Sequence, residues 1–227
     1  MQKPLFAILL DGGYLTKMLF SRLKRPITAD DITAECERLM GIPEVKDYEL
    51  LRIYYYDALP SADALKKPVS GEDLNLADSE RFRHSQSLFD NLIMQPNMAL
   101  RMGKLSLSPS KWKLKPKVAV ELIGNPRALT DDDFLLDLTQ KGVDMRIGMD
   151  MARLALRQMV RAVIVVTGDS DFVPAFKYVR REGVKVILEP MGKSGRVELR
   201  QHADVVLPPP PKPAQPAAAP LAAEAAQ

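Results

Sequence analysis

The chain has 227 residues, of which 46% are hydrophobic and 27% are charged, the composition of a globular protein with one sizeable core. Its single cysteine, Cys36, excludes a disulfide framework and a four-cysteine zinc site, and we expect it to lie in the core. No apolar stretch approaches the roughly 20 residues of a membrane helix, and no signal peptide precedes the first apolar run, so we expect a cytoplasmic α/β protein.

Predicted strands and helices alternate along residues 1–207. Short apolar or β-branched runs bounded by turn residues predict strands, and apolar side chains at helical spacing predict helices. Thr28 and Asp31 have the spacing of a capping box at the start of one helix. The predicted strands are residues 4–10, 50–56, 98–107, 117–122, 162–166 and 184–188, and the predicted helices are residues 29–40, 78–93, 144–161 and 171–181.

The clearest unit lies between residues 162 and 188. A strand at 162–166, a loop at 167–170, a helix at 171–181 and a strand at 184–188 form a βαβ unit. Such a unit joins parallel strands by a right-handed crossover. We therefore expect a Rossmann-like α/β fold, a three-layer αβα sandwich with a mostly parallel central sheet.

The composition changes at residue 208. Residues 208–227 are almost entirely proline and alanine, with too little apolar bulk to offset the entropy of ordering. We predict one domain over residues 1–207, followed by a disordered or polyproline II tail. That tail is either an inert extension or a docking peptide for a protein partner.

Acidic residues follow the predicted strands, where open parallel sheets bind their ligands. Asp11 follows the first strand and precedes two glycines. Asp169 and Asp171 follow the first strand of the βαβ unit, and Asp144 and Asp150 lie in the helix that leads into that strand. If these two strands are neighbours in a doubly wound sheet, the acids converge in one crevice.

Converging carboxylates indicate a cation. They repel one another unless a positive charge lies between them, and oxygen ligands suit Mg²⁺ or Mn²⁺. Such ions support the in-line displacement of phosphoryl groups. The alternative is that the acids are helix caps, because Ser170 and Asp171 begin a helix and Asp144 precedes one.

Other catalytic sites lack their motifs. The sequence has neither the glycine-rich dinucleotide-binding motif nor a P-loop. Phe172 stands where a nucleophile elbow built on Ser170 would have its second glycine. His84 and His202 are predicted in helices away from the strand ends, so we do not expect them to be general bases.

Four short segments occur in a characteristic order: DGGY at residues 11–14, KGVD at 141–144, VTGDSDF at 166–172 and GVKV at 183–186. Together they resemble the NYN domain family, and within it the LabA-like branch, in the PIN-like superfamily of metal-dependent nucleases. The resemblance covers most of residues 3–207. It implies a Rossmann-like sheet, an acidic pocket for Mg²⁺ or Mn²⁺, and RNA as the substrate.

The resemblance assigns catalytic and metal-binding roles to Asp11, Asp144, Asp169 and Asp171, and adds Asp150 as a further metal ligand. On an ideal helix Asp144 and Asp150 lie about 120° apart and therefore do not share one face.

Neighbouring residues are given supporting roles. Thr167 and Ser170 are expected to position the acids or a water through their hydroxyls. Tyr14 stands where many relatives have asparagine, which removes a polar group beside the first acid. Family members often dimerise, so the resemblance also implies a homodimer.

Residues 110–117 alternate basic with apolar side chains, and in an extended conformation their four lysines lie on one side and a tryptophan on the other. This segment is either a ribbon that follows RNA phosphates and stacks a base, or an edge strand that lysines protect from aggregation. The net charge of +3 is compatible with a polyanionic partner but does not indicate one. The residues predicted to contact RNA are Arg101, Lys104, Lys111, Trp112, Lys113, Lys115 and Lys117.

Three functions remain open. The first is a metal-dependent ribonuclease whose aspartates support the attack of water on an RNA phosphodiester. The second is a non-catalytic regulatory or RNA-binding module on the same fold, which the tail and Tyr14 favour. The third, a small-molecule phosphatase, lacks the D-x-D motif of an aspartyl nucleophile, because two glycines follow Asp11.

Overall fold

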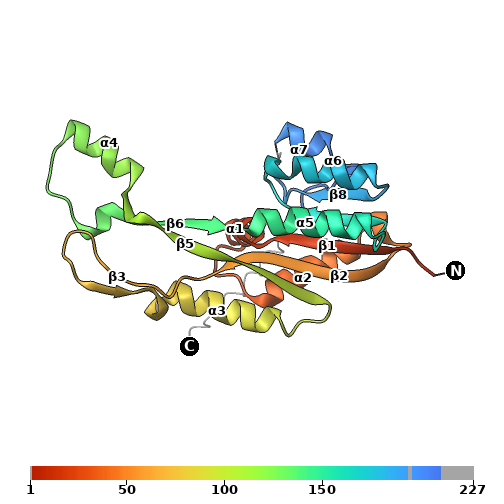
Figure 1. Cartoon of the computed structure of the whole chain (residues 1–227), viewed down its shortest axis with the longest axis horizontal. Coiled ribbons are helices and arrows are strands. Elements are labelled where there is room, and N and C mark those ends of the chain that lie inside the picture. Colours follow the sequence, from red (N-terminus) through yellow and green to blue (C-terminus); the bar gives the residue numbers. More distant parts are fainter. Residues whose placement is uncertain (1, 194–195, 211–227) are drawn as a thin grey trace, which may run out of the picture.

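The computed structural model describes residues 2–193 and 196–210 and has an α/β fold (Figure 1). Its centre is a seven-stranded sheet with the strand order β6-β5-β2-β1-β7-β8-β9. All neighbouring strands of this sheet are parallel except β5 and β6, which are antiparallel. The predicted α/β class with a mostly parallel sheet is confirmed.

The strands of the sheet are β1 (Leu5–Asp11), β2 (Glu49–Leu59), β5 (Met98–Leu114), β6 (Phe134–Lys141), β7 (Ala162–Val166), β8 (Lys185–Glu189) and β9 (Val205–Val206). The strands β3 (Ala64–Lys66) and β4 (Asp73–Asn75) form a separate antiparallel hairpin. The helices are α1 (Gly12–Leu23), α2 (Ala29–Met40), α3 (Glu80–Leu92), α4 (Pro116–Gly124), α5 (Val143–Leu156), α6 (Val173–Arg181) and α7 (Val197–Gln201).

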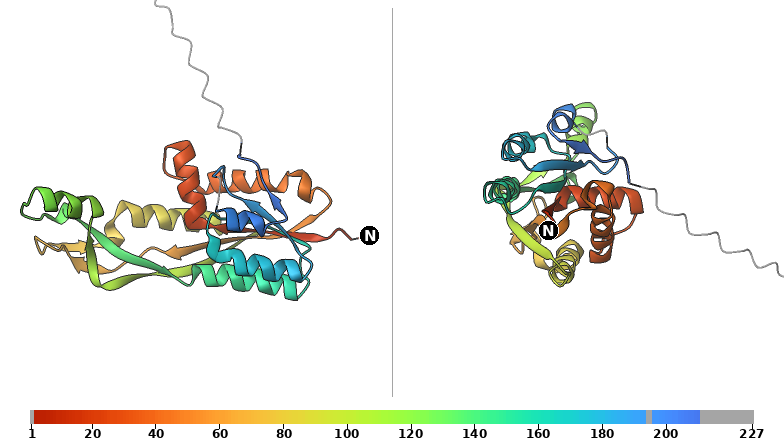
Figure 2. Two further views of the ribbon diagram at one scale, coloured as in Figure 1. Left: turned by 90° about the horizontal axis from the view of Figure 1, so that it is seen from above. Right: turned by 90° about the vertical axis from the view of Figure 1, so that its right-hand side faces the viewer.

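Helices cover the sheet on both faces, which gives three layers (Figure 2). One core forms where α1, α2 and α3 pack on the sheet, and Cys36 is buried there as predicted. The second core forms where α5, α6 and α7 pack on the opposite face. Every residue of β7 is buried because the strand is covered on both faces, as its continuous apolar run indicates.

The βαβ unit lies where it was predicted, with small shifts at its ends. The loop after β7 leads into a 3₁₀ turn, Ser170–Phe172, and α6 begins only after that turn. The predicted helix at 144–161 ends earlier, as α5, and Gln158 beyond it has a positive φ of 51°. The capping box of Thr28 and Asp31 is present at the start of α2.

One predicted strand is wrong. Residues 117–122 lie in the helix α4, although their valines and alanine alternate as in a strand. Pro116 occupies the start of this helix, where its fixed φ and missing N–H are tolerated. This proline also ends the preceding strand, so the alternation at 117–122 does not continue it.

The strands β5 and β6 continue away from the sheet as an antiparallel arm that carries α4 at its end (Figure 1). Beyond Lys104, β5 pairs only with β6. The predicted extended segment at 110–117 is only partly extended, because Lys111 has a φ of 60°, the strand ends at Leu114 and a helix begins at Pro116. Its four lysines therefore do not share one face.

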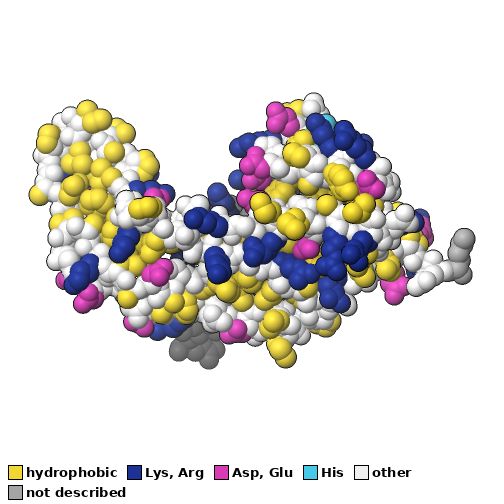
Figure 3. Space-filling view, in the orientation of Figure 1, with side chains coloured by type: hydrophobic (Ala, Val, Ile, Leu, Met, Phe, Trp, Pro, Cys, Tyr) yellow, Lys and Arg dark blue, Asp and Glu magenta, His cyan; other side chains and the backbone are white. Residues whose placement is uncertain are grey.

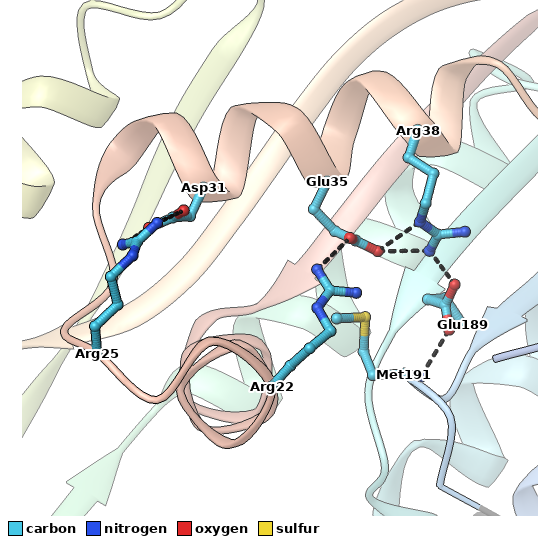
Figure 4. Close-up of polar contacts among 7 residues, drawn as sticks. All are labelled: Arg22, Arg25, Asp31, Glu35, Arg38, Glu189 and Met191. Carbon is cyan, nitrogen blue, oxygen red and sulfur yellow. Dashed lines mark hydrogen bonds and ion pairs between the residues drawn. The ribbon is translucent and has the colours of Figure 1, made fainter. Parts of the chain in front are cut away.

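Buried ion pairs fix α1 and α2 to the end of β8 (Figure 4). Glu35 and Glu189 are almost fully buried, and the guanidinium of Arg38 lies between them and donates to both. Arg22 also donates to Glu35, at 3.1 Å. Burial raises the pKa of Glu189, and the charge of Arg38 opposes that shift. Pairing is what makes two buried carboxylates tolerable in one core.

No helix among residues 2–193 and 196–210 is long and apolar enough to cross a membrane. The predicted tail, residues 208–227, lies outside the described residues from position 211 onward.

Candidate active site

The site lies where the sheet changes its winding direction. The strand β1 lies between β2 and β7, with β5 beyond β2 on one side and β8 and β9 beyond β7 on the other. Open α/β sheets bind ligands at such a switch point, beyond the carboxyl ends of the strands. Leu10 pairs with Val166 across β1 and β7, so the residues that follow, Asp11 and Thr167, are neighbours. The predicted adjacency of the two strands is confirmed.

Asp11 is held by hydrogen bonds from the start of α1 and from the loop after β7. The backbone N–H of Tyr14 donates to its Oδ1 and the Thr167 hydroxyl donates to its Oδ2, each at 3.1 Å. The first of these bonds also caps α1. Burial of the carboxyl outweighs both hydrogen bonds and, with the charges of Asp144 and Asp57, raises the pKa of Asp11 to about 6.

The turn after β7 is organised by its own polar side chains. Thr167 Oγ1 accepts a hydrogen bond from the Asp169 N–H, and Asp169 Oδ1 accepts one from the Asp171 N–H. Asp169 therefore caps the 3₁₀ turn. The sequence had instead indicated Ser170 and Asp171 as the start of the helix. The Ser170 hydroxyl accepts a hydrogen bond from Arg196 Nη1 at 2.7 Å, so the structure links it to the start of α7.

Asp144 lies in the first turn of α5 and completes the cluster. Partial burial, followed by the charges of Asp169 and Asp171, raises its pKa. Because Asp144 also acts on Asp11, it lies within electrostatic reach of each of the other three predicted acids. The structure thus brings together side chains from β1, α5 and the turn after β7.

Asp57 is a further acid of this site that the sequence reading missed. It lies near the end of β2, in register beside the residues that follow β1, and accepts hydrogen bonds from the Tyr55 hydroxyl and the Ala58 N–H. Burial raises the pKa of Asp57, and its charge contributes to the shift at Asp11. The sequence could have identified Asp57, because it directly follows the predicted strand at 50–56.

Asp150 is not part of the cluster. Its Oδ2 accepts hydrogen bonds from the Tyr56 hydroxyl at 3.0 Å and from Arg101 Nε at 3.2 Å. The side chain therefore faces β2 and β5 about two turns along α5 from the cluster. Arg101, predicted to contact RNA, is engaged in this ion pair and lies over the ring of Tyr54.

The donor chemistry of the cluster fits a hard divalent cation, because all of its side-chain donors are carboxylate or hydroxyl oxygens. The raised pKa values of Asp11 and Asp144 indicate that negative charge is unfavourable there, and a cation would relieve it. In the part of the chain that the structure describes, no three acidic, histidine or cysteine side chains are close enough to hold a metal ion as they stand. Bound metal would require the carboxylates to converge further.

Tyr14, in the first turn of α1, contacts the segments that follow β7 and β8. A Cβ built on Gly168 would lie 2.4 Å from the Tyr14 ring, so only glycine lets the ring pack against this turn. The Tyr14 hydroxyl donates to the carbonyl of Pro190, after β8, at 2.7 Å. Tyr14 therefore packs directly against the turn that bears Asp169.

Lysine and arginine side chains gather beside the site, over α5 and the adjoining strands (Figure 3). Lys104 of β5 faces Lys141 of β6 directly across the ladder, and both side chains are exposed. Like charges opposite one another destabilise a sheet unless an anion lies between them. On the arm, Lys113 forms an ion pair with Asp137 at 2.9 Å, and Trp112 Nε1 donates to the carbonyl of Lys66.

Comparison with known proteins finds a family similarity for part of the chain. Residues 119–208 match the NYN domain. The match includes Asp144 and the whole turn from Thr167 to Asp171, whereas Asp11 and Asp57 lie outside it. NYN domains have a PIN-like nuclease fold.

The full chain has no match among curated proteins. Among solved structures it is similar to a protein of unknown function from Vibrio parahaemolyticus RIMD 2210633, with a TM-score of 0.51 and 16% sequence identity. The alignment covers 91% of this chain and 93% of that protein. At this identity the similarity shows a shared fold.

Proposed function

We propose that this chain is a ribonuclease that depends on Mg²⁺ or Mn²⁺ and belongs to the LabA-like branch of NYN domains. The observation that carries the proposal is that Asp144 lies within electrostatic reach of Asp11, Asp169 and Asp171 at the switch point of the sheet. The NYN match over residues 119–208 supports a nuclease.

The four aspartates would hold the cation. When bound, Mg²⁺ or Mn²⁺ supplies an activated water and stabilises the leaving oxygen of a phosphodiester. Thr167 orients Asp11 through one hydrogen bond and the turn of Asp169 through another. Asp57 adds negative charge beside Asp11, which strengthens the attraction of the site for a cation.

RNA is proposed as the substrate because cations lie next to the acids. Lys104 and Lys141 form an exposed positive pair on neighbouring strands, and an RNA phosphate between them would remove their repulsion. The lysines and the tryptophan of the arm are proposed as more distant contacts. Phosphate contacts of this kind position RNA without reading its sequence.

The test is cleavage of labelled single-stranded and hairpin RNAs by the full chain in Mg²⁺, Mn²⁺ or EDTA. We expect cleavage in metal, none in EDTA, and its loss in Asp169→Asn, which removes a charge and keeps the shape of the cap. Asp90→Asn is the matched control, since Asp90 is exposed on α3, where it accepts a hydrogen bond from Gln86. Full activity of the Asp169→Asn protein would refute the assignment of the site.

A non-catalytic RNA-binding module is the second candidate. The observation that favours it is that both oxygens of Asp11 already accept hydrogen bonds from the protein. RNA binding that persists in EDTA, without cleavage in either metal, would establish this function in place of the nuclease.

A further inference from the structure

A cleft of about 970 Å³ opens beside the acidic site. Its walls come from α1, from α3 and the segment before it, and from the β5–β6 arm. Gly13 and Asp57 belong to the wall, and a Cβ built on Gly13 would lie 3.8 Å from Asp11 Oδ1. The cleft is therefore continuous with the candidate active site.

The interior of the cleft is largely apolar and includes aromatic rings. Phe20 from α1 and Phe82 and Phe89 from α3 line it, together with leucines of α3, β5 and β6. Phe89 belongs to the core, but Phe20 is 54% exposed and Phe82 is partly exposed. Two phenylalanine rings thus remain accessible within a concave surface, where they can stack on a planar ligand.

Basic residues line the same cleft. Lys17, Arg81 and His84 are exposed residues of its wall. Lys17 makes no hydrogen bond or ion pair with the described part of the chain, and Arg81 is near enough to Asp57 to act on that carboxyl electrostatically. Positive charge at the rim and aromatic rings inside suit a ligand that has both phosphates and planar bases.

We propose that this cleft receives one or two unstacked bases of a single-stranded RNA whose backbone passes the acidic site. Its volume is at the upper end of the roughly 300–1,000 Å³ that is typical of small-ligand pockets. Stacking on phenylalanine selects unpaired bases without selecting their sequence, and Lys17 and Arg81 would neutralise adjacent phosphates. The inference rests on the proposed RNA substrate but not on its cleavage.

Base stacking requires an unpaired strand. Bases within an RNA duplex are covered by their neighbours and cannot enter a side cleft, whereas loops and single strands can place a base against an aromatic ring. The proposal therefore makes the chain selective for single strands over duplexes of equal length.

The experiment measures binding of the full chain to a fluorescently labelled single-stranded RNA and to its duplex, in EDTA so that no metal-dependent cleavage takes place. We expect Phe20→Ala to weaken single-strand binding by about 5- to 150-fold, the range for loss of one base stack. Phe82→Leu, which keeps apolar bulk and removes the ring, should act in the same direction. Lys17→Ala should reduce the slope of log affinity against log salt by about one.

The matched control is Ile123→Ala, an 85% exposed apolar side chain on α4 outside the cleft, which should bind as the parent does. If both phenylalanine variants are folded and also bind as the parent does, the cleft does not receive bases, and cleavage by the parent in metal would still support the proposed nuclease. If they weaken binding while no metal supports cleavage, the cleft proposal stands and the nuclease fails. Equal affinity for single strand and duplex would overturn the cleft proposal.

Discussion

Replacement of Asp11 by asparagine tests the electrostatics of the candidate site with little change in its shape. The carbonyl of the new amide can still accept the Tyr14 N–H, and its NH₂ group can donate to the Thr167 hydroxyl, so both hydrogen bonds of Asp11 have replacements. What changes is the charge. The substitution therefore measures the free-energy cost of burying the charge, with little contribution from changed packing.

The magnitude follows from the pKa of Asp11, which burial and neighbouring acids raise from 3.8 to about 6. The folded state binds the proton more tightly than the unfolded state, so stability falls as the pH rises from about 4 to about 6 and stays low above that. At pH 8 the ionised carboxyl costs about 3 kcal/mol of folding free energy. Near pH 4 the cost is below about 1 kcal/mol.

We expect Asp11→Asn to be more stable than the parent by about 2–3 kcal/mol at pH 8 and nearly equal to it at pH 4, in EDTA. For a chain of this size that is a rise in Tm of roughly 4–12 °C. Urea unfolding at both pH values measures the difference. Addition of Mg²⁺ or Mn²⁺ should stabilise the parent, because an ion that binds only the folded state adds to its stability. The difference in unfolding free energy between the parent and Asp11→Asn should therefore become smaller.

The control is Asp31→Asn, for which we expect the opposite change in folding stability. Arg25 lowers the pKa of Asp31, so its ionised form stabilises the fold, and loss of the charge should destabilise the chain at pH 8 and matter less at acidic pH. An Asp11→Asn protein that is no more stable than the parent at pH 8, or is equally stabilised at both pH values, would refute the electrostatic reasoning.

Two further substitutions test the packing around the site. Arg38→Met leaves the buried Glu189 without its cationic partner, while Arg22 still pairs with Glu35, and should cost about 3–5 kcal/mol in urea unfolding. A loss below about 1 kcal/mol would contradict the buried network. Gly168→Ala places a methyl group against the Tyr14 ring and should destabilise the chain by about 1–3 kcal/mol, whereas Gly124→Ala, with open space around it, should not. Tyr14→Ala in the Gly168→Ala chain should remove most of this added cost, as a double-mutant cycle would show.

The central strands could be predicted because their residues are apolar on both faces and are bounded by turns. All residues of β7 and the interior residues of β1 and β8 are buried, and such strands have continuous apolar runs. Once these strands were placed, the rule for parallel sheets put the acids that follow them at one edge. The position of Asp11 beside the turn that carries Asp169 and Asp171 therefore followed from local pattern and topology together.

The arm could not be predicted in the same way. The strand β6 is partly exposed and was missed, and α4 was interpreted as a strand because apolar and small residues alternate at 117–122. These segments are not covered by other elements on both sides, so the spacing of their apolar residues does not indicate which face is buried. Pro116 was the one local signal for a helix start.

Asp150 shows what helix geometry could and could not decide. The angle of about 120° between Asp144 and Asp150 on a helix indicates that only one of them faces a common site. Which one does depends on what each face meets. Tyr56 and Arg101, from strands distant in sequence, bind Asp150, and no local pattern contains that information.

Three of the four proposed metal ligands and the accessible aromatic rings of the proposed base cleft come from different parts of this chain. Asp144, Asp169 and Asp171 lie within residues 119–208, the part that matches the NYN domain, whereas Phe20, Phe82 and the cations of the cleft lie outside it. The topology of the sheet places α1 and α3 beside residues 119–208, because α1 begins directly after β1 and α3 lies between β2 and β5 in the chain. Substitutions in α1 and α3 could therefore change which RNA is bound while the arrangement of the carboxylates stays the same. It follows that exchanging Phe20 or Phe82 should alter affinity for single strands without altering the metal dependence of the reaction, whereas exchanging Asp169 should do the reverse.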